Sequence, residues 1–143
     1  MFTCGASYYG ISDLEAMTNH THKFESHYLE GLIGAYPEKK NRYIKRSPIH
    51  HMKNFSSPII LFQGGKDKVV PKIQSEMIFN SLKKRNIPVA YVYFKEEAHG
   101  FRIAKNIQKC LESELFFYSK IFHLKPNETL LAVPIHNSEE LED

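Results

Sequence analysis

The chain has 143 residues, which is enough for one domain of ordinary size and too few for two. Hydrophobic residues make up 42% and charged residues 24%, a balance that argues against a disordered, collagen-like or disulfide-stabilised chain. The formal net charge is only +3 and the basic residues occur in short separated groups, so the composition does not favour nucleic-acid binding.

The sequence contains no run of about 18 apolar residues, so it predicts no transmembrane helix and no membrane partner. Its first residues lack the charged and apolar regions of a secretory signal. The two cysteines, Cys4 and Cys110, form no C-x-x-C motif, and we expect buried thiols in a reducing compartment. The histidines show no H-x-x-x-H spacing, and no G-x-G-x-x-G loop is present. We therefore expect a cytoplasmic protein that binds neither a metal ion nor a cofactor.

The first predicted element is a buried strand over residues 2–9, which consists of apolar and small side chains. Ser12 and Asp13 then provide the N-cap signal of a short helix. The stretch 19–46 is polar and rich in histidine. It contains one apolar cluster that predicts a helix ending at Gly34, formed by Tyr28, Leu29, Leu32 and Ile33.

The pattern becomes clearer from residue 57 onward. Residues 59–62 form a continuous apolar run, which is typical of a strand buried on both faces. Pro71 occupies a favourable position at the start of a helix, and an apolar stripe continues to Leu82. Pro88 prevents that helix from continuing, and residues 89–94 form the next predicted strand.

A final helix of roughly five turns is indicated by apolar residues spaced three or four apart, and we expect this stripe to face the core. The stripe consists of Ile103, Ile107, Leu111, Leu115, Tyr118 and Phe122. Residues 125–143 are predicted to form a mobile acidic tail with one docked segment near 130–135. The alternation of strands and helices predicts an α/β fold with about three parallel strands and flanking helices.

Two residues follow these strands at their carboxyl ends, where catalytic and ligand-binding residues lie in sheets of this kind. Asp67 follows the strand at 59–62, and His99 follows the strand at 89–94. Because the carboxyl ends of parallel strands share one edge of the sheet, these side chains are expected to meet there. A carboxylate orients a histidine ring that acts as a base, and this chain order is the one used by α/β-hydrolases. From placement alone, two alternatives stay open: Asp67 as a turn former or helix cap, and His99 as a solvated loop residue.

Longer strings of this sequence resemble one known family. They are ASYYGISDL at 6–14, HKFES at 22–26, SPIH at 47–50, SPIILFQG at 57–64, DKVVP at 67–71, QSEM at 74–77, NIPVAY at 86–91 and EAHGFR at 97–102. Over residues 3–124, the chain resembles the C-terminal part of the catalytic domain of the prolyl oligopeptidase family of serine peptidases. The dipeptidyl-peptidase and acylaminoacyl-peptidase-like members are the most similar.

This resemblance implies that residues 1–124 are a partial α/β-hydrolase domain, followed by the tail at 125–143. It also implies hydrolysis of peptide or acyl-peptide bonds, with Asp67 as the acid and His99 as the base of a catalytic triad.

The nucleophile of that family is a serine in a G-x-S-x-G elbow, and these 143 residues contain no such motif. The nearest candidate is Ser7, where Tyr9 replaces the second glycine. We therefore expect the nucleophile to be absent and the chain to be inactive alone. A peptide substrate would bind only once the missing N-terminal part completes the site.

Two other hypotheses belong to different functional classes. The chain could be a non-enzymatic, truncated module that associates with a partner or with a second copy through the exposed edge of its sheet. It could also be a small esterase that uses Ser7, Cys4 or Cys110 as its nucleophile.

Overall fold

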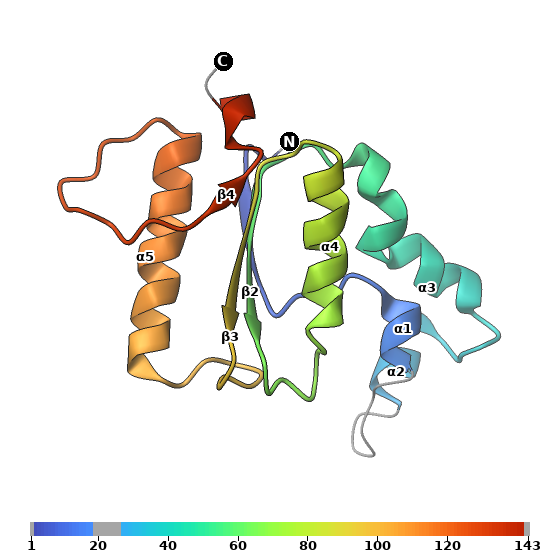
Figure 1. The fold of residues 1–143 in the computed structure, drawn as a ribbon. Coiled ribbons are helices and arrows are strands. Elements are labelled where there is room, and N and C mark those ends of the chain that lie inside the picture. Colours follow the sequence, from blue (N-terminus) through green and yellow to red (C-terminus); the bar gives the residue numbers. More distant parts are fainter. Residues whose placement is uncertain (1, 19–26, 142–143) are drawn as a thin grey trace.

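A four-stranded sheet lies at the centre of the computed structural model, which describes residues 2–18 and 27–141 (Figure 1). The strands occur in the order β1-β2-β3-β4. In the part of the chain described, α5 covers one face of the sheet and α4 covers the other, with the smaller helices on the same side as α4 (Figure 1). The string at 22–26 lies outside the described residues.

The three longer strands are parallel, as the sequence predicts. They are β1 (Gly5–Tyr8), β2 (Ile59–Gly64) and β3 (Val89–Phe94). Five of the six residues of β2 are buried, which agrees with a strand covered on both faces. A short fourth strand, β4 (Ile135–His136), adds to β3 in the antiparallel direction.

The side chains of β2 and β3 alternate between two hydrophobic clusters. On one face, Leu61 and Val89 pack with the residues of α4 (Ile73–Lys84), including Leu82. On the other face, Phe62 and Val92 pack with α5 (Ala104–Ile121). Helix α4 follows β2 and helix α5 follows β3 along the chain. The two connecting loops therefore lie at the carboxyl ends of neighbouring strands.

Four short helical elements precede β2 within residues 2–18 and 27–58. They are α1 (Leu14–Thr18), α2 (Tyr28–Ile33), α3 (Lys40–Arg46) and the 3-10 helix η1 (Pro48–Asn54). The predicted N-cap of α1 is confirmed, because Asp13 Oδ1 accepts hydrogen bonds from the backbone N–H groups of Glu15 and Ala16. The sequence pattern did not predict α3 and η1. Helix α3 buries a single side chain, Tyr43, so no apolar periodicity marks it.

The orientation of α5 differs from the prediction. Five of the six residues of the expected core stripe are exposed: Ile103, Ile107, Leu111, Leu115 and Phe122. The helix instead buries Cys110, Ser113, Phe117 and Ser119. Small side chains such as Ser113 let the helix approach the sheet closely, and the larger aliphatic row is left on the outer surface.

Part of the expected tail docks on the sheet. Ile135 and His136 pair with Ala90 and Val89, and Val133 is buried in the cluster beneath α5. The side-chain amide of Asn137 donates hydrogen bonds to two backbone carbonyls, Lys83 O near the end of α4 and Ile87 O in the loop before β3. The docked segment therefore extends beyond the predicted 130–135, and it is followed by the 3-10 helix η2 (Ser138–Leu141).

Candidate catalytic acid–base pair

The loops after β2 and β3 are held against each other at the carboxyl edge of the sheet. The backbone N–H of Gly65 donates to Phe94 O, and that of Lys66 donates to Glu97 O. A Cβ atom on Gly64 would lie 2.5 Å from Glu97 O, so the two loops could not approach this closely with any other residue there. The loop that carries Asp67 is thus fixed to the loop that carries His99.

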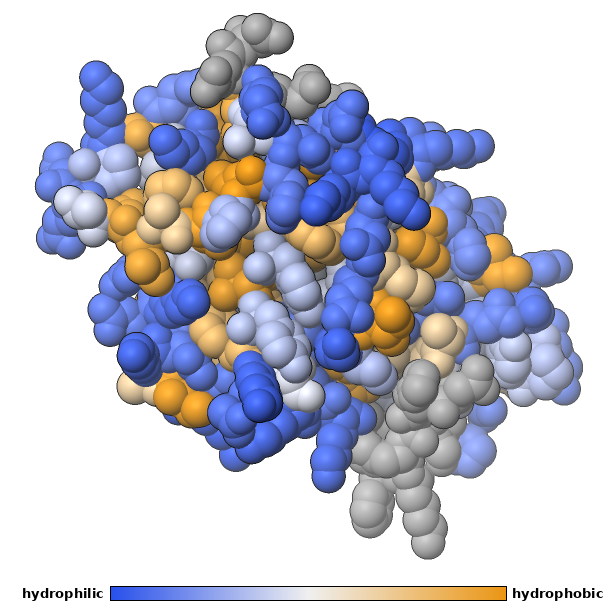
Figure 2. Space-filling model, viewed as in Figure 1, coloured by the Kyte–Doolittle hydropathy of each residue, from blue (hydrophilic) through white to orange (hydrophobic). Residues whose placement is uncertain are grey.

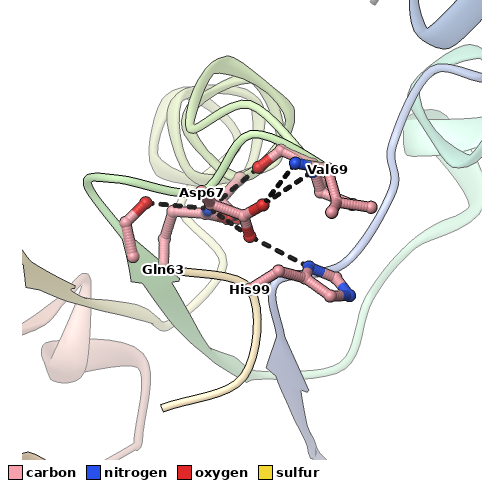
Figure 3. Close-up of polar contacts among 7 residues, drawn as sticks. Gln63, Asp67, Val69 and His99 are labelled. Atoms are coloured by element: carbon pink, nitrogen blue, oxygen red, sulfur yellow. Dashed lines mark hydrogen bonds and ion pairs between the residues drawn. The ribbon is translucent and has the colours of Figure 1, made fainter. Parts of the chain in front are cut away.

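Asp67 and His99, predicted from strand order alone, are joined by a hydrogen bond (Figure 3). His99 Nδ1 lies 3.0 Å from Asp67 Oδ2. The side chain of Asp67 is fully buried, whereas 38% of the His99 side chain is exposed. In the described residues, the second ring nitrogen of His99 has no hydrogen-bond partner, so it can contact a ligand.

The other oxygen of Asp67 has a second role. Oδ1 accepts hydrogen bonds from the backbone N–H groups of Val69 (2.9 Å) and Val70 (2.8 Å) (Figure 3). Asp67 is therefore the turn former that its position also suggested, and it orients His99 with its remaining oxygen. The turn and the contact with His99 use different oxygens, so one carboxylate makes both sets of hydrogen bonds at once.

A buried glutamine fixes the same carboxylate from the side of the sheet. Gln63 is fully buried at the end of β2, and its Nε2 group donates to Asp67 Oδ2 (3.3 Å) and to Val70 O (3.1 Å). Its Oε1 atom accepts a hydrogen bond from Ser75 Oγ in α4 (2.8 Å). Sequence reasoning did not select Gln63. The available signal was a polar side chain that directly continues a buried apolar run.

Glu97 holds the loop of His99 in an analogous way. This glutamate is only 3% exposed. Its carboxylate accepts hydrogen bonds from the backbone N–H groups of Arg102 and Ile103, both 3.0 Å, and from the side-chain amide of Asn106 at 2.9 Å. Burial alone would raise the pKa of Glu97, but these hydrogen bonds outweigh it and the pKa is lowered. Glu97 thereby ties the start of α5 to the loop, in which Gly100 adopts a positive φ of 82°.

A half-open hollow of about 650 Å³ lies beside the exposed part of the His99 ring. Most of the side chains that line it are apolar, and they include Ile11, Met17, Leu29 and Val70. The ring of Tyr9 borders it at 4.6 Å from the ring of His99. The arrangement can place an apolar group next to a histidine whose tautomer is set by a buried carboxylate.

The three alternative nucleophiles lie in less suitable positions. Ser7 lies within β1 opposite Leu61, and among the described residues it forms no hydrogen bond with His99. Cys4 precedes the amino end of β1, at the opposite edge of the sheet from His99. Cys110 is buried in α5, and burial raises the pKa of its thiol to about 12, which disfavours the reactive thiolate.

Other site types find little support in the described part of the chain. Within residues 2–18 and 27–141, no three His, Cys, Asp or Glu side chains are grouped closely enough to bind a metal ion. None of the helices in these ranges combines the length and hydrophobicity that a membrane span requires.

The motifs suggest membership of a known family, and a comparison with family sequence models tests this. The sequence model of the prolyl oligopeptidase family matches residues 1–125. The chain belongs to the prolyl oligopeptidase family. The family resemblance and the α/β-hydrolase fold expected from the sequence are both confirmed.

Individual members of the family match across most of this chain. A puromycin-hydrolyzing peptidase of Mycobacterium tuberculosis is 40% identical, with a TM-score of 0.86 over 93% of this chain and 20% of its own. An acylaminoacyl peptidase of Pyrococcus horikoshii is 26% identical, with a TM-score of 0.68 over 90% of this chain and 22% of its own. Dipeptidyl aminopeptidase BIII of Pseudoxanthomonas mexicana is 28% identical over 73% of this chain and 16% of its own length. The chain thus spans about a fifth of these relatives.

Proposed function

We propose that this chain contributes the acid and the base of a serine-peptidase active site. The observation that carries the proposal is the 3.0 Å contact between His99 Nδ1 and the buried Asp67 carboxylate, with the other ring nitrogen directed toward open space. In this role Asp67 keeps the proton on Nδ1 and stabilises the imidazolium ion when it forms. His99 Nε2 accepts the proton of a hydroxyl nucleophile and later delivers it to the leaving amine.

The substrate class proposed is a peptide or acyl-peptide bond. The printed names of the relatives, a dipeptidyl aminopeptidase, an acylaminoacyl peptidase and a puromycin-hydrolyzing peptidase, support this class. The apolar hollow next to His99 suits an apolar side chain close to the bond that is cleaved.

The nucleophile of the proposed site lies outside these 143 residues. The sequence has no G-x-S-x-G elbow, and one donor of the oxyanion hole normally follows that serine. We propose that the chain alone does not hydrolyse peptides, since removing the nucleophile of such a triad lowers kcat by about a millionfold.

A hybrid enzyme tests the acid–base role. The matching fifth of the M. tuberculosis peptidase is replaced by this chain, and the release of product from puromycin is measured. We expect an active hybrid in which His99→Ala lowers kcat by about 10⁶-fold and Asp67→Asn by about 10⁴-fold, with KM little changed. Lys125→Ala, an exposed residue far from the pair, is the control and leaves kcat unchanged. A folded hybrid whose activity survives His99→Ala overturns the proposal.

Labelling of the 143-residue chain tests the absence of a nucleophile. A fluorophosphonate probe is expected to form no adduct, because no activated serine is present. An adduct on Ser7 that disappears in Ser7→Ala, together with hydrolysis of p-nitrophenyl acetate, would establish the small-esterase alternative instead.

A further inference from the structure

The ring of His99 has a second neighbour besides Asp67, the ring of Tyr9. The hydrogen bond to Asp67 fixes the position of Nδ1, but it leaves the imidazole free to pivot about that atom. The ring centroids of Tyr9 and His99 lie 4.6 Å apart with the planes inclined at 55°, a spacing at which aromatic rings attract each other. In Figure 3, the ring of His99 lies beside the blue ribbon that leaves β1, the strand that Tyr9 follows. The two contacts together define both the position and the plane of the imidazole.

Tyr9 is held in a backbone conformation that a bulky residue rarely adopts. Its φ of 42° lies in the left-handed region, and such conformations persist only where the surrounding structure imposes them. The backbone N–H of Tyr9 donates to Phe62 O (2.7 Å), which ties the turn after β1 to the neighbouring strand. A Cβ atom on Gly10 would clash with Ser7 Oγ, so the turn can be this tight only with glycine there. These constraints direct the Tyr9 ring toward the loop that carries His99.

The ring of Tyr9 is also braced against the hydrophobic core. It makes an edge-on contact with Phe101, with the centroids 5.4 Å apart and the planes at 89°. Phe101 packs in turn on Phe94, a buried residue at the end of β3, with the centroids 5.1 Å apart. His99 and Phe101 flank Gly100, whose φ of 82° lets both rings reach Tyr9. Within the described residues the hydroxyl of Tyr9 forms no hydrogen bond, so the ring alone links the histidine to the core.

We propose that Tyr9 is a positioning residue that holds the plane of the His99 imidazole, so that Nε2 keeps one direction. This role rests on the acid–base function proposed above. Proton transfer requires Nε2 within hydrogen-bond reach of the nucleophile, and a misplacement of about 1 Å lowers the rate about 100-fold. Both rings belong to the described part of this chain, so their contact does not depend on what covers its outer surfaces.

Kinetics of the hybrid enzyme described above test the role in the reaction. Tyr9→Leu removes the ring but keeps an apolar side chain, and we expect kcat to fall about 10- to 100-fold with KM changed less than about threefold. Tyr9→Phe keeps every ring contact and is expected to restore kcat to within about twofold of the wild type. Ile11→Ala, which alters the hollow without touching these rings, should instead raise KM.

NMR of the 143-residue chain tests the positioning without any need for activity. In the wild type, nuclear Overhauser effects are expected between the ring protons of Tyr9 and His99. In Tyr9→Leu, the order parameter of the His99 ring C–H bonds should fall from about 0.8 to below about 0.6, whereas Tyr9→Phe should keep the wild-type value.

The matched control is Phe122→Leu, an aromatic-to-leucine change at the C-terminal end of α5. Hydrophobic side chains reach the surface over α5 on the left of Figure 2, as in Figure 1, and Phe122 is 47% exposed. Both kcat and the order parameter of His99 should be unchanged in this variant. Thermal melts of all variants verify that they fold.

The outcomes separate this role from the acid–base function on which it rests. If His99→Ala abolishes activity but Tyr9→Leu keeps the wild-type kcat, the positioning role alone is overturned. A loss confined to KM, or an equal loss of kcat in Tyr9→Phe, would also overturn it, because the effect would then come from substrate contact or from the hydroxyl. An unchanged order parameter in Tyr9→Leu would overturn it even in an inactive hybrid. Activity that survives His99→Ala instead contradicts the acid–base function itself.

Discussion

Replacing Glu97 by glutamine tests whether one buried carboxylate fixes the histidine loop. Three N–H donors face the carboxylate, from the backbone of Arg102 and Ile103 and from the side chain of Asn106. A glutamine side chain has the same shape as glutamate but only one acceptor oxygen. Its NH₂ group must therefore face at least one N–H donor, whichever way the amide is turned.

The size of the effect follows from these contacts. One hydrogen bond to a charged group is lost, which costs about 1.5–3 kcal/mol, and the remaining ones weaken because their acceptor is now neutral. We expect the free energy of unfolding to fall by about 2–4 kcal/mol. For a domain of this size, that corresponds to a decrease in Tm of about 6–12 °C.

The effect depends on pH in a defined direction. The pKa of Glu97 is lowered in the folded state from the ordinary value of 4.5. Its stabilising contribution is therefore complete above the pKa of the unfolded chain and is lost as the pH falls through the lower pKa of the folded state. The stability difference between wild type and Glu97→Gln should be full at neutral pH and should shrink below about pH 4.5.

Urea unfolding followed by circular dichroism, at pH 7 and at acidic pH, measures this difference. Glu96→Gln is the matched control, because this neighbouring glutamate lies on the surface in an ion pair with Lys66. Its removal should change the free energy of unfolding by less than about 1 kcal/mol. A Glu97→Gln effect no larger than that of the control, or one that does not depend on pH, would refute the assigned role.

Three other predictions concern the same part of the molecule. In Asp67→Asn the amide can still accept hydrogen bonds in the turn, but its NH₂ group faces His99. ¹⁵N NMR should therefore show the ring change from the Nδ1–H to the Nε2–H tautomer, and an unchanged tautomer would contradict the geometry. Gly64→Ala should destabilise the chain by at least about 2 kcal/mol in urea unfolding, because the new Cβ would lie 2.5 Å from Glu97 O; an unaffected midpoint would be inconsistent with this contact. Cys110, whose pKa is raised to about 12, should react with a disulfide reagent at pH 8 only after unfolding, and rapid reaction of the native thiol would show that it is accessible.

The sequence predicts the parallel strands and the contact between Asp67 and His99 for a common reason. Buried parallel strands are recognisable as continuous apolar runs, such as the one at residues 59–62. Once the strands are placed, the rule that their carboxyl ends share an edge brings Asp67 and His99 together. No side-chain geometry is needed for that step.

The features that the sequence did not predict are those in which polar or small residues are buried. Gln63 and Glu97 are typical surface residues by composition, and only their partners explain their burial. In α5, the small and mixed face with Cys110 and Ser113 packs on the sheet, while the more regular aliphatic row remains outside. Periodicity identifies a helix but does not decide between two faces of comparable hydrophobicity.

The two oxygens of Asp67 make different contacts, and this difference predicts how positions 67 and 99 change during evolution. Because Oδ1 closes the turn before α4, an acidic or amide residue at this position stabilises the fold even where no reaction takes place. His99 is bonded only through its side chain to that same carboxylate, and much of its ring faces solvent. Among relatives that have lost activity, the acid should persist by selection for stability, whereas the histidine should drift. On the proposed acid–base role, the residue whose presence distinguishes an active relative from an inactive one is therefore the histidine.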